Sequence, residues 1–209
     1  MEKRRIFLLS LAACLLLGLT GCGPREEALA AKPVIYLYPR EETEITVKLD
    51  YDGELTASWP AYEDGWSVAA RPDGTLTDSQ GREYSYLFWE GFSHQEYDFS
   101  QGFCVPGGET GPFLREALAA LGLTPREYNE FIVYWLPRME RNLWNLIAFQ
   151  DTAYTDHARL EVSPSPDAML RVFMAWKPLD AAVEIQAQEL KSFQRQGFTL
   201  VEWGGAEVS

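Results

Sequence analysis

The sequence predicts an α+β domain in which strands dominate and helices appear late in the chain. Two observations favour this class. Apolar side chains alternate with polar ones through much of the first ninety residues, which is typical of half-buried strands, whereas helical spacing begins only near residue 110. Because strands and helices are segregated rather than alternating, α+β is favoured over α/β.

The N-terminal part predicts a β-meander or half of a sandwich. The run VIYLY at residues 34–38 lies between two prolines and predicts a strand buried on both faces. Five further runs predict strands because they alternate or are bounded by turn signals such as Pro-Asp-Gly. These runs are residues 45–51, 55–59, 66–70, 75–77 and 83–89. Residues 91–111, with five glycines, predict a long loop.

Two helices are predicted next. Thr110 can cap a helix that ends before Gly122, and Thr124 with Glu127 forms a capping box for a second one. Residues 131–136 fit either a helical stripe or a strand. The β-branched and aromatic residues, followed by Pro137, favour a short helix to Glu130 and then a strand.

The sequence of the C-terminal third predicts four strands, with one helix before the last of them. The strands are residues 145–150, 159–163 and 169–176, and the last strand is 198–203. A helix is expected over residues 186–196, ended by Gly197.

The N-terminus resembles a bacterial lipoprotein signal. Basic residues precede an apolar run that ends in Leu19-Thr20-Gly21-Cys22, a lipobox-like motif. The resemblance implies a signal peptide at 1–21, a lipidated tether at 22–31 and a single domain at 32–209. It also implies a diacylglyceryl group on Cys22 that holds the protein at the outer face of the cytoplasmic membrane. An ordinary signal peptide or an uncleaved anchor is the alternative.

Charge and cysteine usage narrow the classes of function further. Removing residues 1–21 leaves 15 basic and 30 acidic side chains, a net charge of −15, which disfavours nucleic acid as a partner. With Cys22 lipidated and Cys14 removed, Cys104 is left alone and no intramolecular disulfide is expected.

No cofactor or metal site is predicted, because zinc-type ligand spacing, nucleophile-elbow, phosphate-loop and dinucleotide motifs are missing from the sequence. Carboxylates are the catalytic candidates. Glu90 and Glu202 lie at predicted strand ends beside tryptophan and glycine, and Glu130 and Glu140 flank the FIVYWLP run. A pair of carboxyl groups about 5 to 9 Å apart would suit glycoside hydrolysis.

Aromatic residues make up 13% of the chain, and most of them are expected in the core. Trp89, Trp135 and Trp203 are the candidates for a ligand platform.

Six segments carry a resemblance to an uncharacterised family of secreted or lipid-anchored proteins of clostridial-type bacteria, with distant fungal relatives. The segments are KPVIYLYP (32–39), RPDGTL (71–76), YSYLFWEG (84–91), NEFIVYWLP (129–137), PSPDAMLRVFM (164–174) and VEWGG (201–205). This resemblance implies an extracytoplasmic single domain and assigns no activity.

The sequence therefore favours a lipid-anchored, non-catalytic protein that binds an envelope glycan or peptide. A carboxylate-dependent hydrolase and a structural subunit of a membrane-proximal complex are the alternatives.

Overall fold

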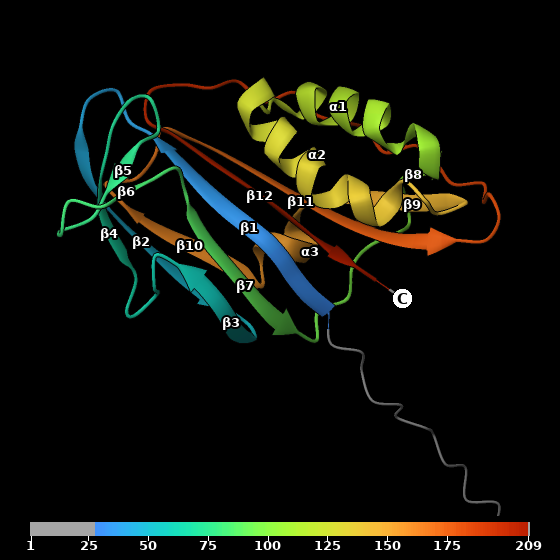
Figure 1. Ribbon diagram of the computed structural model, residues 1–209, viewed down its shortest axis with the longest axis horizontal. Helices are drawn as coiled ribbons and strands as arrows, with labels where there is room; N and C mark the ends of the chain where they lie inside the picture. The colour runs from blue at the N-terminus through green and yellow to red at the C-terminus, as the bar shows by residue number, and fades with distance from the viewer. Residues whose placement is uncertain (1–27, 209) are drawn as a thin grey trace, which may run out of the picture.

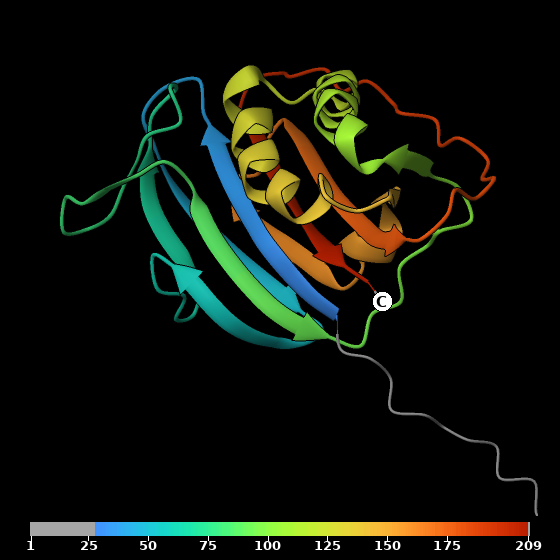
Figure 2. The same cartoon turned by 45° about the vertical axis from the view of Figure 1, so that its right-hand side comes forward.

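The computed structural model describes residues 28–208 and shows a strand-rich α+β domain with three layers. A seven-stranded sheet lies in the middle. Two helices cover one face of this sheet, and a five-stranded sheet covers the other (Figures 1 and 2). The fold class expected from the sequence is confirmed at this level.

The central sheet has the order β3-β7-β1-β12-β11-β9-β8. All neighbouring strands are antiparallel except β11 and β12, which run parallel. The bounds are β1 Ala28–Tyr38, β3 Glu54–Trp59, β7 Leu87–Ser93, β8 Phe103–Pro106, β9 Trp144–Gln150, β11 Ala168–Leu179 and β12 Thr199–Glu207.

Strand β1 is buried on both faces, as the apolar run predicted. Val34 and Tyr36 pack toward the helices, whereas Ile35 and Leu37 pack toward the second sheet. This alternation follows from the period of two along a strand. Each residue of this run therefore contributes to one of two separate cores.

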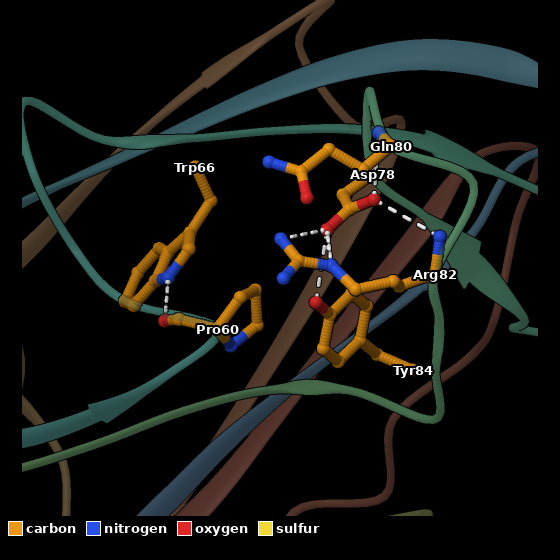
Figure 3. Close-up of polar contacts among 6 residues, drawn as sticks. All are labelled: Pro60, Trp66, Asp78, Gln80, Arg82 and Tyr84. Atoms are coloured by element: carbon orange, nitrogen blue, oxygen red, sulfur yellow. Dashed lines mark hydrogen bonds and ion pairs between the residues drawn. The ribbon is translucent and has the colours of Figure 1, made fainter.

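The second sheet has the order β10-β2-β4-β5-β6. Its strands are β2 Thr43–Tyr51, β4 Trp66–Ala70, β5 Leu76–Thr77, β6 Glu83–Tyr84 and β10 Ala158–Ser163. The turn between β5 and β6 is organised by Asp78, whose carboxylate accepts hydrogen bonds from Arg82 Nε at 2.7 Å and Tyr84 OH at 2.9 Å (Figure 3). Desolvation opposes ionisation, but the bonds from Arg82 outweigh it and lower the pKa of Asp78.

Helices α1 (Thr110–Leu121) and α2 (Pro125–Met139) begin close to the predicted places, and α1 ends before Gly122 as predicted. Thr110 is the first residue of α1 rather than its cap, because the N-cap position is taken by Glu109. Gly122 takes a left-handed conformation, with φ of 107°, and the Thr124–Glu127 capping box is present. Helix α2 lies across β1 and β12 (Figure 2). A 3₁₀ turn (Gly107–Glu109) and a short helix α3 (Thr152–Thr155) complete the helical elements.

The predicted strand over residues 131–136 is wrong, because α2 continues to Met139. Pro137 lies in the last turn, so its missing N–H and its ring disturb only the end of the helix. Phe131, Trp135 and Met139 are spaced four residues apart and are all buried against the central sheet. Burial of this stripe outweighs the strand preference of its residues.

The predicted helix over residues 186–196 is also wrong. This segment is irregular, and its polar groups bond to other parts of the chain. Gly102 N–H donates to Gln186 O at 2.9 Å, and Gln188 exchanges hydrogen bonds with the backbone of Phe149. Such tertiary hydrogen bonds replace those of the expected helix.

The predicted loop over residues 91–111 is wrong in part. Strand β7 extends to Ser93, β8 occupies residues 103–106, and α1 begins at Thr110. Residues 94–102 are left as the irregular part. Among residues 28–208, no helix combines the length and the apolar character needed to cross a membrane.

Candidate functional site

The most unusual backbone position in the described residues is Lys32, in the first half of β1. The register of β1 shifts between Ala31 and Val34, and Lys32 takes a φ of 58° within this bulge. Left-handed backbone is uncommon for residues other than glycine, and such positions gather at functional sites. The Lys32 N–H donates to Glu90 Oε1 on the neighbouring strand β7, at 3.1 Å.

The Lys32 side chain lies against aromatic rings of β7 and the segment before it. Its Nζ donates to Tyr86 OH at 3.1 Å and lies 4.8 Å from the centre of the Tyr86 ring and 5.3 Å from that of Phe88. Attraction between an ammonium and the faces of aromatic rings favours this position. The bulge therefore holds the Lys32 ammonium group against the rings of Tyr86 and Phe88.

Helix α2 supplies the opposite wall. Glu130, Tyr134 and Arg138 are spaced four residues apart and share one side of the helix, with Val133 and Pro137 beside them. The Arg138 guanidinium lies 4.1 Å from the centre of the Tyr134 ring. Together with Lys32, Tyr86 and Asn129, these residues line a hollow of about 480 Å³. We call it the Lys32 pocket.

Two of the predicted carboxylates flank this pocket. Glu130 Oε2 accepts a hydrogen bond from Tyr36 OH at 3.1 Å. Burial, followed by the charge of Glu130, raises the pKa of Tyr36. Burial and then the charge of Glu90 raise the pKa of Tyr134. Both tyrosines are therefore protonated at neutral pH. Tyr36 is fully buried and holds Glu130, whereas Tyr134 lines the pocket, where its hydroxyl can donate or accept a hydrogen bond.

The other two carboxylates lie elsewhere. Glu202, 1% exposed, is buried between the two sheets, where it accepts hydrogen bonds from Arg171 Nε at 2.6 Å and Trp89 Nε1 at 3.3 Å. Glu140 follows the last turn of α2 and is exposed. Neither residue lines the Lys32 pocket.

The three tryptophans considered as a ligand platform are core residues. Trp135 and Trp203 are buried between α2 and the central sheet, and Trp89 is buried between the two sheets. Each is at most 1% exposed, so none offers a ring face to a dissolved ligand.

The pocket residues missed from the sequence are Lys32, Tyr86, Tyr134 and Arg138. A helical interpretation of residues 131–137 would have placed Glu130, Tyr134 and Arg138 on one side of a helix. No comparable pattern marks Lys32, because the bulge depends on how β1 pairs with β7 and β12.

Cys22 lies outside the described residues. Within residues 28–208, no group of His, Cys, Asp or Glu side chains is arranged to hold a metal ion. Asp73 and Asp78, which lie in the turns on either side of β5, accept hydrogen bonds from nearby groups. Asp73 bonds to Thr75 N–H, and Asp78 bonds to Arg82.

No family model and no solved structure matches the chain. Over 83 residues it is 48% identical to a protein of Butyrivibrio fibrisolvens described as "Uncharacterized protein in bglA 3'region". The match covers 37% of this chain and 85% of that protein. The chain therefore belongs to the same family as this uncharacterised Butyrivibrio protein.

Proposed function

We propose that this is a lipid-anchored extracytoplasmic protein that binds an envelope glycan or peptide in the Lys32 pocket without transforming it. The observation that carries the proposal is the strained Lys32 bulge, which places a cation and two aromatic side chains opposite the polar side of α2. Strain of this kind is retained where a site requires it.

The pocket has the size and chemistry of a small-ligand site. Its volume of about 480 Å³ falls within the range typical of such sites. Tyr86 and Tyr134 offer ring surface, Asn129 an amide, and Glu130 and Arg138 charges of opposite sign. Sugar hydroxyls and peptide groups each need donors and acceptors beside an apolar surface, which this combination supplies.

The proposed location follows from the lipobox-like motif at Cys22. Ala28, where β1 begins, lies only six residues after that cysteine, so an anchor there would keep the pocket close to the membrane surface. The net charge of −15 expected after removal of residues 1–21 further disfavours nucleic acid as the ligand. The resemblance to secreted clostridial-type proteins agrees with this location.

Glycan and muropeptide arrays probed with soluble protein comprising residues 25–209 test the proposal. Val133 is 75% exposed at the pocket, so Val133→Arg blocks the entrance without removing core contacts. Leu143→Arg is the matched control, because Leu143 is a 67% exposed apolar residue outside the pocket lining. We expect binding by the wild type and the control and its loss in Val133→Arg. Equal binding by all three, or none by the wild type, would refute the proposal.

A carboxylate-dependent hydrolase is the second candidate, because Glu90 and Glu130 flank the same pocket. Turnover of an array ligand, abolished by Glu130→Gln with binding retained, would favour this candidate over simple binding. Binding without turnover in the wild type would exclude it for that ligand.

A further inference from the structure

A second hollow lies at the opposite side of α1 from the Lys32 pocket, along β8 at the edge of the central sheet. It has a volume of about 870 Å³ and is walled by β8, the first half of α1 and residues 183–187. The last of these belong to the irregular connection from β11 to β12, which passes outside β8 and α1 (Figure 2). We call it the β8 groove.

The floor of the β8 groove is apolar. The Phe103 and Phe113 rings lie with their centres 5.0 Å apart, and Val105, Pro112 and Ile185 continue the apolar lining. A long irregular connection that borders a hollow of this size is typical of a functional surface.

The charged side chains that line the β8 groove are all acidic. Glu109, Glu116 and Glu184 come from the 3₁₀ turn, from α1 and from the irregular connection, and each is exposed. Among the described residues no lysine or arginine lines the groove, although the exposed Arg115 lies 3.6 Å from the Glu116 carboxylate, whereas the Lys32 pocket is lined by both Lys32 and Arg138. A ligand with an apolar body and positive charges is therefore electrostatically complementary to this groove.

The outer edge of β8 also has backbone N–H and C=O groups that can pair with another strand. Gly107 N–H donates to Leu143 O on the β9 side, so residues 103, 105 and 107 face β9 while residues 102 and 104 face outward. The outward backbone groups of Gly102 form a parallel bridge to Ala187. In the described residues this pairing does not continue to Cys104, where the Val183 N–H donates to the side-chain Sγ at 3.4 Å and the outward backbone N–H and C=O have no backbone partner.

We propose that the β8 groove binds an extended, cationic segment of a protein partner. The segment adds to the sheet by pairing its backbone with Cys104, as in other cases where a peptide extends a sheet edge. One apolar side chain packs on Phe103 and Phe113, and lysine or arginine side chains lie among Glu109, Glu116 and Glu184. This site is separate from the Lys32 pocket and does not depend on the ligand proposed there.

The test measures fluorescence anisotropy of a labelled short peptide of alternating lysine and valine, added to the full-length protein in neutral lipid nanodiscs. Two control peptides are used. One replaces lysine with glutamate, and the other carries N-methyl groups at alternate residues, which removes backbone donors while keeping the charge. We expect the lysine peptide to bind most tightly of the three.

Two protein variants of equal charge separate the groove from the acidic surface in general. The groove variant combines Glu109→Gln, Glu116→Gln and Glu184→Gln. The control combines Glu44→Gln, Glu63→Gln and Glu161→Gln at exposed positions outside the groove lining. We expect the affinity of the groove variant for the lysine peptide to fall about tenfold, because three exposed ion pairs are lost together. The affinity of the control variant should fall far less.

Hydrogen exchange gives an independent readout, because main-chain pairing should slow exchange at the Cys104 amide when the lysine peptide is bound. Equal losses in both variants would mean nonspecific attraction and would overturn the proposal. Equal binding of the N-methylated peptide, or no binding of the lysine peptide, would overturn it as well.

Discussion

Arg171 and Glu202 occupy paired positions on the parallel strands β11 and β12 and form an ion pair of 2.6 Å between the two sheets. Their side chains are 9% and 1% exposed. Trp89 Nε1 donates to the second carboxylate oxygen, and the Arg171 guanidinium lies 4.9 Å from the centre of the Tyr154 ring. A carboxylate that resembled a strand-end catalytic residue is thus part of the core.

Removing one member of this pair should destabilise the fold strongly. Arg171→Met leaves Glu202 as an unpaired buried charge, at a cost of about 3 to 5 kcal/mol in the free energy of unfolding. Urea denaturation followed by tryptophan fluorescence measures the loss. The double variant Arg171→Met/Glu202→Leu should recover much of it, because apolar replacement of both partners leaves no unpaired charge. If both variants were equally unstable, charge pairing would not explain the effect.

The left-handed backbone at Lys32 predicts an unusual order of stabilities. Lys32→Ala and Lys32→Gly remove the same side-chain contacts with Tyr86 and Phe88. Glycine adopts φ of 58° without the strain that alanine retains, so Lys32→Gly should be the more stable variant by about 1 kcal/mol. Thermal and urea unfolding provide the comparison. A more stable alanine variant would show that the bulge is unstrained or absent in solution.

The buried tyrosines predict loss of stability in alkaline solution. Burial, followed by the charge of Glu130 or Glu127, raises the folded-state pKa of Tyr36 and Tyr38 above the unfolded value of about 10. Their stabilising contribution is therefore complete below pH 10 and is lost as the pH rises above it. Ultraviolet absorbance of tyrosinate, compared with unfolding at each pH, tests this. Reversible ionisation of all tyrosines near pH 10 in the folded protein would contradict it.

The proposed anchor makes a prediction for cell fractionation. Cys22→Ser removes the only sulfur at the lipobox-like motif, so the variant should leave the membrane fraction or retain its signal, while Cys104→Ser should stay with the membrane. Mass spectrometry of the mature N-terminus identifies the lipid. Unchanged membrane association and processing in Cys22→Ser would rule out the anchor.

Local signals in the sequence predict much of this fold. Capping at Thr124, the left-handed stop at Gly122 and the alternating strands depend on near neighbours, and the structure confirms them. Contacts between distant parts of the chain explain the elements that were predicted wrongly. Trp135 packs against Gly205 and Trp176, which no local preference reveals, and these contacts hold residues 131–136 in a helix.

The candidate site was harder to predict than the fold. Glu130 is a candidate from the sequence because it precedes an apolar run, yet its setting depends on Tyr36, which lies 94 positions earlier in the chain. Glu90 meets the pocket through the backbone of Lys32 in the β1 bulge and through Tyr134 of α2. Pairing between distant strands places Glu90, and packing of α2 on the central sheet places Glu130. A single sequence does not show either arrangement directly.

Nuclear magnetic resonance of the soluble domain offers the most direct test of the Lys32 pocket. Isotope-labelled protein is titrated with muropeptides from digested peptidoglycan and, separately, with the glycan strands. One of the two should shift the amide signals of Lys32, Tyr86, Tyr134 and Arg138, and Val133→Arg should abolish those shifts. Shifts confined to other surfaces, or shifts that persist in Val133→Arg, would contradict ligand binding at this pocket.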